Sequence, residues 1–267
     1  MKYCINYYKD FRYLNEINEI IFTPKDINEN FIKYVEDNFK QEQRIIVSLV
    51  NAGDLASMMP LIDKLRSIHS NYAIIIKLTQ YDANLLSGHT FFFGEYCKTY
   101  DQVATFIAMG VSDVYIVETL AFSLRDIGNY AHEYDVNVRV LPNVAQSTLG
   151  SISRLPQECK FFIRPEDVDV YEPYVDVFEL FGDVSRLSVT YEVYNEKQWQ
   201  GPISYIVKGL DDMFSLDAAT PFGEQRLSCG QKCYKCEYCT RQVEINKIAD
   251  KYKLKIKKAE NNDVNNS

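Results

Sequence analysis

Four cysteines near the C-terminus are the residues most suited to chemistry. They fall within eleven positions, as Cys229, Cys233, Cys236 and Cys239. Thiolates placed this close repel one another unless a soft cation neutralises them, and the lysines beside them favour the thiolate form. The segment is also too polar for four unrelated buried thiols. The spacing therefore predicts a metal site on these four residues.

The spacing favours iron over zinc. Structural zinc sites usually divide four ligands into two pairs separated by a longer loop, and this segment has no such loop. Cys233, Cys236 and Cys239 follow one another at intervals of three residues, as in the runs that hold an iron–sulfur cluster. We therefore expect a 4Fe-4S cluster, with zinc as the alternative. Cys97 would be the remote ligand if one of the local four is spare.

The first three of these cysteines also match the Cys-x-x-x-Cys-x-x-Cys triad of the radical S-adenosylmethionine enzymes. In that superfamily the triad follows the first barrel strand, whereas here it follows the last predicted one. The usual aromatic residue before the third cysteine is Lys235. An atypical radical enzyme, with one iron free to bind S-adenosylmethionine, is therefore a further hypothesis.

Short apolar segments alternate with segments of helical periodicity before the cysteines. Eight segments are predicted as strands: Glu19–Phe22, Arg44–Leu49, Tyr72–Leu78, Thr90–Phe93, Asp113–Val117, Val136–Leu141, Lys160–Ile163 and Val175–Leu180. They are continuously apolar, which is typical of parallel strands buried on both faces. This order predicts an α/β fold, a (β/α)8 TIM-like barrel. An open sheet is the alternative, because the connection Thr79–His89 is short for a helix.

The barrel places further candidate residues, because active sites of such barrels lie at the C-terminal ends of the strands. Four charged residues there are predicted to be catalytic: Lys77, Glu118, Arg164 and Glu179. Four polar residues are predicted to bind substrate: Asn51, Glu95, Asn143 and Gln146. Lys77 and Arg164 would hold an anionic group, and Glu118 and Glu179 would move protons or orient ligands.

Charged residues near the predicted strand ends also have a structural interpretation. Asp54 is expected to cap a helix, and Glu166 and Asp167 are expected in the first turn of one. A charge inside an apolar run is costly unless it is paired. Interstrand ion pairs inside the barrel would therefore also account for the four residues predicted to be catalytic.

Charge is unevenly distributed along the 267 residues. The net charge is −8, yet residues 225–258 contain ten basic and three acidic residues. We expect a barrel over 1–200, a basic Cys-rich extension over 201–260 and a disordered tail over 261–267. Such an extension is suited to contacts with RNA or a protein partner. No apolar run reaches the about 18 residues of a membrane span, and no signal peptide is evident, so we expect a cytoplasmic protein without a membrane partner.

Three strand segments resemble the collagenase-like peptidase family: Gly110–Val117, Val140–Ser147 and Val177–Gly182. The resemblance implies a barrel with a 4Fe-4S cluster on cysteines that supports oxygen-independent hydroxylation of ubiquinone precursors or of transfer and ribosomal RNA. By motif position Glu179 carries over as an active-site acid. The cysteines depart from the family pattern, because none lies between Gly182 and Ser228.

These observations lead to two main classes of function. The first is an iron–sulfur-dependent barrel enzyme that carries out redox or hydroxyl-transfer chemistry on a small polar substrate or an RNA base. The second is a non-catalytic module in which zinc folds the basic extension, which then binds RNA or a protein. The identity of the metal separates them.

Overall fold

The computed structural model describes residues 1–27, 30–116, 124–144, 146–147, 160–199, 201, 203–208, 222–227, 238 and 241. The four clustered cysteines and Glu118 lie outside the described residues. The predicted boundaries of the Cys-rich extension and of the tail therefore stay predictions.

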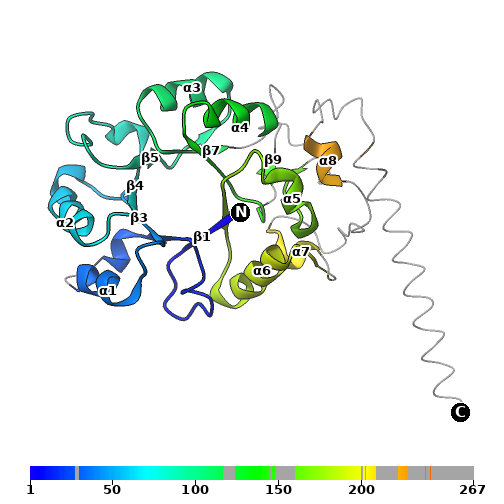
Figure 1. Ribbon diagram of the computed structural model, residues 1–267, viewed down its shortest axis with the longest axis horizontal. Helices are drawn as coiled ribbons and strands as arrows, with labels where there is room; N and C mark the ends of the chain where they lie inside the picture. The colour runs from blue at the N-terminus through cyan, green and yellow to red at the C-terminus, as the bar shows by residue number, and fades with distance from the viewer. Residues whose placement is uncertain are drawn as a thin grey trace, which may run out of the picture.

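Nine parallel strands form one sheet that curls into a nearly closed barrel (Figure 1). Their order is β5-β4-β3-β2-β1-β11-β8-β7-β6. The strands are β1 (Lys2–Asn6), β2 (Glu19–Phe22), β3 (Arg44–Ser48), β4 (Tyr72–Ile76), β5 (Phe91–Phe93), β6 (Tyr96–Cys97), β7 (Asp113–Ile116), β8 (Asn137–Val140) and β11 (Val177–Leu180). Nearly all of their residues are buried, as expected for parallel strands covered on both faces.

The two edge strands of this sheet are consecutive in the chain, and this brings the barrel close to closure. β5 pairs with β4, and β6 pairs with β7 on the other side. Only Gly94 and Glu95 separate β5 from β6, and the backbone N–H of Gly94 still donates to Ile76 of β4 at 2.9 Å. Eight chain segments therefore surround the interior, the number that the TIM-like prediction requires.

Helices pack around the outside of the strands (Figure 1). They are α1 (Phe31–Asn38), α2 (Leu55–Ile68), α3 (Tyr100–Ala108), α4 (Leu124–His132), α5 (Val168–Tyr171) and α6 (Val184–Glu196). The carboxylate of Asp54 accepts from the backbone N–H of Ala56 at 3.1 Å and caps α2, which confirms its predicted capping role. Two connections depart from the regular alternation: residues 7–18 form no helix, and residues 77–90 form only the 3-10 helix η2 (Leu78–Gln80).

Two predicted features of the strand order were wrong. β1 was not predicted, yet it pairs with β11 and β2 inside the barrel. Lys160–Ile163 was predicted as a barrel strand, but β10 (Lys160–Phe161) pairs antiparallel with β9 (Gln146–Ser147) in a separate two-stranded sheet. Phe162 and Ile163 are buried, so the apolar run reflects packing outside the barrel wall.

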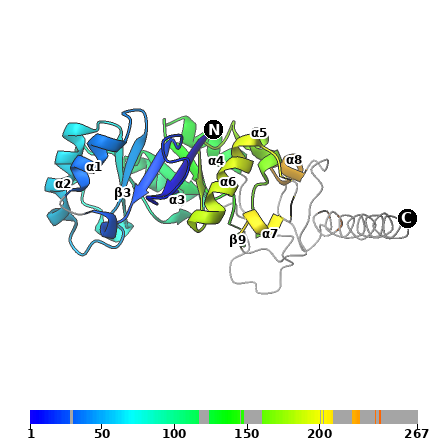
Figure 2. The same ribbon diagram turned by 90° about the horizontal axis from the view of Figure 1, so that it is seen from below.

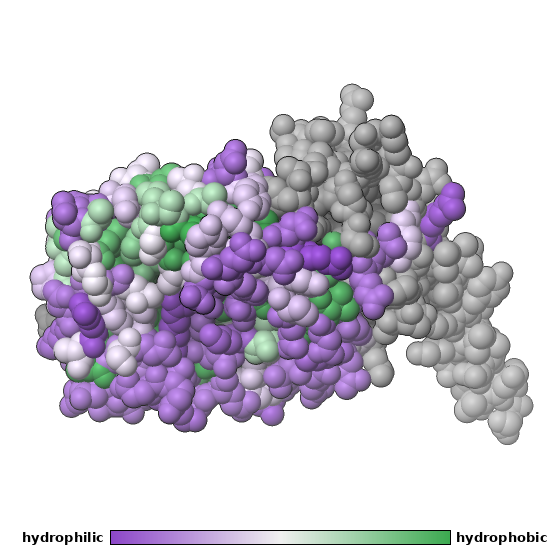
Figure 3. Space-filling view, turned by 45° about the horizontal axis from the view of Figure 1, so that its top comes forward, coloured by the Kyte–Doolittle hydropathy of each residue, from purple (hydrophilic) through white to green (hydrophobic). Residues whose placement is uncertain are grey.

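Short elements lie at one side of the barrel, before and after β11 and α6 in the chain. The 3-10 helix η4 (Pro165–Asp167) leads into α5, while α7 (Ile203–Ile206) and α8 (Phe222–Leu227) come after α6. Figure 2 shows α5 and α8 next to each other beyond the strands. The face in Figure 3 is mainly hydrophilic, with hydrophobic side chains in limited patches. Among the described helices, none has the length and apolar character needed to cross a membrane.

Candidate active site

Charged and aromatic side chains occupy much of the barrel interior. Residues that pair across neighbouring parallel strands project to the same face of the sheet. One row of paired residues crosses four adjacent strands and consists of Glu179, Cys4, Glu19 and Arg44. A second row consists of Arg139, Tyr115 and Tyr96. The parallel register thus places two acids, a thiol, two cations and two tyrosines around one interior.

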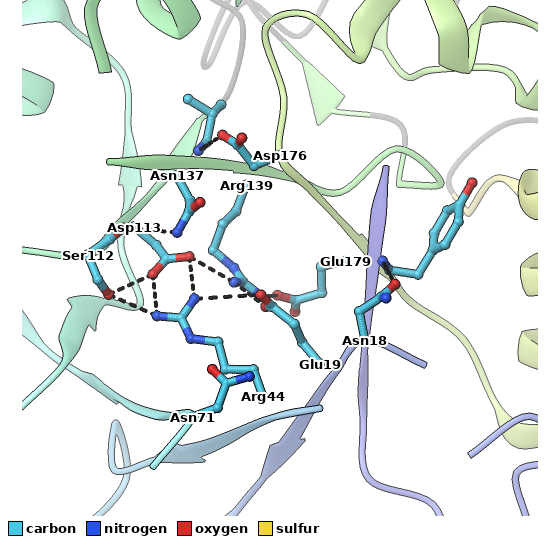
Figure 4. A network of polar contacts seen from close by, with 12 residues as sticks. Asn18, Glu19, Arg44, Asn71, Ser112, Asp113, Asn137, Arg139, Asp176 and Glu179 are labelled. Atoms are coloured by element: carbon cyan, nitrogen blue, oxygen red, sulfur yellow. Dashed lines mark hydrogen bonds and ion pairs between the residues drawn. The ribbon is translucent and has the colours of Figure 1, made fainter. Parts of the chain in front are cut away.

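Two sets of ion pairs cross this interior (Figure 4). Arg44 on β3 donates to both carboxylate oxygens of Asp113 on β7, each at 2.8 Å. Arg139 on β8 donates through Nη1 to Glu19 on β2 at 2.6 Å and to Asp113 at 3.1 Å. Neither β3 and β7 nor β2 and β8 are neighbours in the sheet. The charges therefore connect distant walls of the barrel.

Asp113 lies at the N-terminal end of its strand, where the network has a structural role. Glu19, Arg44 and Asp113 are each the first residue of their strand, so they lie at the end of the barrel opposite to where active sites occur. Burial acts to raise the pKa of Asp113, but the guanidinium groups of Arg44 and Arg139 outweigh it and lower that pKa. Ser112 also donates to the Asp113 carboxylate, at 2.6 Å. Asp113 is therefore held as an anion, and together with Glu19 it balances the charges of the two arginines.

Glu179 marks the other end of the network. It is the third of four residues of β11, and its side chain is 12% exposed. Tyr115 donates its hydroxyl proton to Oε2 of Glu179 at 2.5 Å, and Nη2 of Arg139 lies 4.0 Å from the same oxygen. Burial raises the pKa of Glu179, and this effect exceeds the opposing influence of Arg139 and of the Tyr115 hydrogen bond. Glu179 therefore holds a proton more readily than an ordinary glutamate.

Arg139 is the cation next to Glu179. Its side chain is 0% exposed, and its guanidinium carbon lies 5.0 Å from the ring centroid of Phe92 and 5.5 Å from that of Tyr115. Within the described part of the chain, its Nε and Nη2 atoms have no hydrogen-bond partner. Buried donors without partners are rare in proteins. Arg139 thus has hydrogen-bond donors beside Glu179 that no described residue uses.

The arrangement combines a proton-transfer group with a fixed positive charge. Glu19, Asp113 and Glu179 supply three carboxyl groups against two guanidinium groups. The interior is electrically balanced when Glu179 is protonated and carries one excess negative charge when it is ionised. A carboxyl group in this situation is suited to general acid–base chemistry.

The other residues predicted to act at the strand ends lie apart from this network. Lys77 is exposed after β4, and Asn51 is exposed after β3. Glu95, between β5 and β6, accepts from the backbone N–H of Leu78 at 3.0 Å through Oε1, while its buried Oε2 has no partner among the described residues. Lys77 and Glu95 thus lie at the ends of adjacent strands, without contact to Glu179.

Asn143 and Arg164 make structural contacts. The Asn143 amide donates to the carbonyl of Phe181 at 2.6 Å and accepts from its N–H at 2.9 Å, which joins the ends of β8 and β11. Arg164 follows β10, outside the barrel, and pairs with Asp167 through Nε at 2.6 Å and Nη2 at 2.7 Å. Gln146 lies in β9, and its side chain is outside the described residues. The predicted substrate roles of these residues stay predictions.

Sequence reasoning identified Glu179 but missed the other residues of the interior charge network. Glu19, Arg44 and Asp113 begin predicted strands, and the rule of looking at C-terminal strand ends excluded them. Arg139 lies inside the predicted strand Val136–Leu141. It interrupts an apolar run in the same way as Glu179, so the criterion that selected Glu179 would also have found Arg139.

The two described cysteines have the properties of buried neutral thiols. Cys4 and Cys97 are both 0% exposed. Burial raises the pKa of Cys97 to about 12, with a further contribution from Glu95, and raises that of Cys4 well above its usual value. Metal ligation requires the thiolate, so these environments do not favour ligation. Nowhere in the described part of the chain do three or more His, Cys, Asp or Glu side chains gather as metal ligands would.

Comparisons with known proteins give only distant and partial similarities. No family model matches the chain. An uncharacterized protease of Methanocaldococcus jannaschii is 29% identical over 91 residues, which cover 31% of this chain and 27% of that protein. The match thus spans about a quarter of the relative's length. A crystal structure of a protein assigned as an isomerase from Sinorhizobium meliloti, in an open-loop conformation, has a TM-score of 0.48 and 11% identity over 73% of this chain and 52% of its own. The sequence similarity to the protein named as a protease is thus distant and partial, and the nearly closed parallel barrel is established by the strand order of this chain itself.

Proposed function

We propose that this chain is an iron–sulfur-dependent barrel enzyme in which Glu179 transfers a proton to or from a small polar substrate or an RNA base. The observation that carries the proposal is the position of Glu179. It is partly exposed near the C-terminal end of β11, accepts a hydrogen bond from Tyr115, and has a raised pKa. Efficient general acids and bases need a pKa near the working pH, and burial is a common way to raise that of a carboxyl group.

Tyr115 and Arg139 would prepare Glu179 for this role. The Tyr115 hydroxyl fixes Oε2 of the carboxyl group, which leaves Oε1 for the substrate. Arg139 supplies positive charge 4.0 Å from Oε2, so it would stabilise the ionised form after the proton leaves. The Arg139 side chain is 0% exposed, so this charge would act on the carboxyl group of Glu179 rather than on the substrate directly.

Cys229, Cys233, Cys236 and Cys239 would hold the metal centre. Four thiols are a donor set that suits soft metals and iron–sulfur clusters. The centre would supply electron transfer or substrate activation when bound. The supporting observation is in the sequence, where all four thiols fall within eleven residues.

Metal analysis tests the first half of the proposal. The full chain is purified without oxygen, and its optical spectrum, iron, sulfide and zinc are measured. We expect a brown protein with about four irons per chain that Cys233→Ser loses. Cys159→Ser is the matched control, because it removes a thiol outside the four and should keep the iron. A colourless protein with about one zinc would refute the iron–sulfur enzyme and favour a zinc-folded binding module.

Turnover by the metal-loaded protein tests the second half. Small polar compounds and short RNAs are screened by mass spectrometry for a change of mass that depends on the protein. We expect Glu179→Gln to keep the metal and to lower turnover about 10²–10⁴-fold, the usual contribution of a general acid or base. Glu36→Gln changes an exposed acid on α1 and should keep full turnover. Full turnover of Glu179→Gln would refute the assignment of Glu179.

A further inference from the structure

Helix α8 is attached to the barrel through a buried ion pair. The backbone N–H of Gly223 donates to Oδ1 of Asp167 at 3.2 Å, and the contact is buried. The same Asp167 carboxylate binds Arg164 through both of its oxygens, at 2.6 and 2.7 Å. Arg164 and Asp167 are 2% and 5% exposed. A hydrogen bond to a buried carboxylate is stronger than one between neutral groups, so this contact fixes the start of α8.

The contact requires a glycine at position 223. A Cβ atom built there would lie 2.6 Å from Cγ of Asp167 and 2.7 Å from its Cβ. Asp167 cannot give way easily, because Arg164 holds both carboxylate oxygens. Any larger residue at position 223 must therefore move α8 away from η4.

The rest of α8 and Tyr238 also pack against the folded part of the chain. Leu227, the last residue of α8, is 3% exposed and belongs to the hydrophobic core, and Tyr238 packs against that core. Figures 1 and 2 both place α8 beside α5. Glu224 and Leu227 of α8 line a hollow of about 520 Å³, together with Arg125 of α4 and Asp169 and Val170 of α5. Helix α8 thus belongs to the barrel assembly.

We propose that Asp167 and Arg164 are positioning residues that dock α8 through Gly223, and that this docking strengthens metal binding by the cysteines that follow α8 in the sequence. The inference rests on the proposed metal site for its second part. Only Ser228 separates Leu227 from Cys229 in the sequence, and Tyr238 lies between Cys236 and Cys239. Leu227 and Tyr238, which border the cysteines in the sequence, are therefore packed on the core, whereas Arg241 is exposed. Metal binding and the docking of α8 should reinforce each other, because a ligand that binds the docked state more tightly stabilises that state.

Hydrogen exchange on the full chain tests the docking. We expect Gly223→Ala to speed exchange in residues 222–227 while the barrel strands keep their protection. Asp167→Asn should have the same effect, because it removes the charge that binds Gly223 and Arg164. Gly53→Ala is the matched control, since a Cβ atom there has no neighbour within 4 Å. Unchanged exchange in α8 in both Gly223→Ala and Asp167→Asn would overturn the docking role.

Competition with a chelator tests the positioning role. We expect Gly223→Ala to bind metal at least about fivefold more weakly than the wild type, the lower range of typical coupling between sites. Gly53→Ala should bind as the wild type does. Faster exchange in α8 with unchanged metal affinity would overturn the positioning role. A wild-type protein that binds no metal would instead refute the proposed metal site, and the exchange experiment would still decide whether Asp167 docks α8.

Discussion

Arg44 binds the carboxylate of Asp113 with both of its terminal nitrogens, and the pair spans the barrel from β3 to β7. The two strands are separated in the sheet by other strands on either side. A hydrogen bond between neighbouring strands would only reinforce existing pairing, whereas this contact connects walls that share no backbone bond. The interior charges therefore help to hold opposite walls of the barrel together. Glu179 lies away from this pair, near the C-terminal end of β11.

Replacing Asp113 should destabilise the protein strongly. Asp113→Asn removes one of the two carboxylate charges that balance Arg44 and Arg139, and breaking a buried ion pair on one side usually costs about 3–5 kcal/mol. The lowered pKa of Asp113 also means that its stabilisation is complete above the pKa of the unfolded chain and is lost as the pH falls through the folded value. Urea unfolding at neutral pH measures the loss. Asp37→Asn, at an exposed position, is the control. An equal loss of unfolding free energy in both variants would show that the ion pairs of Asp113 do not stabilise the protein.

Glu179 should make stability depend on pH in the opposite direction. Because its pKa is raised in the folded protein, the folded state binds more protons than the unfolded chain between the two pKa values. The free energy of unfolding therefore falls as the pH rises through this window, by about 1.4 kcal/mol for each unit between them. Glu179→Gln resembles the protonated form and should become more stable relative to the wild type as the pH rises.

Urea unfolding at several pH values checks this dependence. The difference in unfolding free energy between Glu179→Gln and the wild type is plotted against pH, with Glu36→Gln as the control on an exposed surface. A rising difference for Glu179→Gln with a flat control is expected. Parallel profiles for both variants would mean that the pKa of Glu179 is the same in the folded protein as in the unfolded chain.

The strands could be predicted where burial and chain order agree. Tyr72–Ile76 and Asp113–Ile116 are continuous buried runs in the interior of the chain, and a parallel sheet is the usual place for them. Lys160–Phe161 has a similar composition but a different partner, because apolar residues indicate burial without indicating what covers them. The strand Lys2–Asn6 is short, contains two polar residues and begins the chain, so local periodicity gave little reason to place it in the barrel.

The candidate site was less predictable, because its members are distant in the sequence. Glu19 and Arg139 are 120 residues apart, yet Nη1 of Arg139 lies 2.6 Å from a carboxylate oxygen of Glu19. Glu179 could be selected from the sequence alone, because it interrupts an apolar run. Its hydrogen bond from Tyr115 could not be predicted, because it follows from the strand register. Arg164 also stood out as a charge in an apolar run, but its partner Asp167 is local. The sequence thus indicates costly charges, and the fold decides how each one is paired.

Thiol labelling should separate the buried cysteines from the predicted metal ligands. Cys4 and Cys97 are 0% exposed and have raised pKa values, so they should react with iodoacetamide only after unfolding, because the thiolate is the reactive form. Removal of the metal with a chelator should expose Cys229, Cys233, Cys236 and Cys239 to labelling and leave Cys97 protected, as peptide mass spectrometry would record. Labelling of Cys97 that begins only when the metal is removed would make it the remote ligand. In that case the metal centre would lie against β6, and the four local thiols would not complete it.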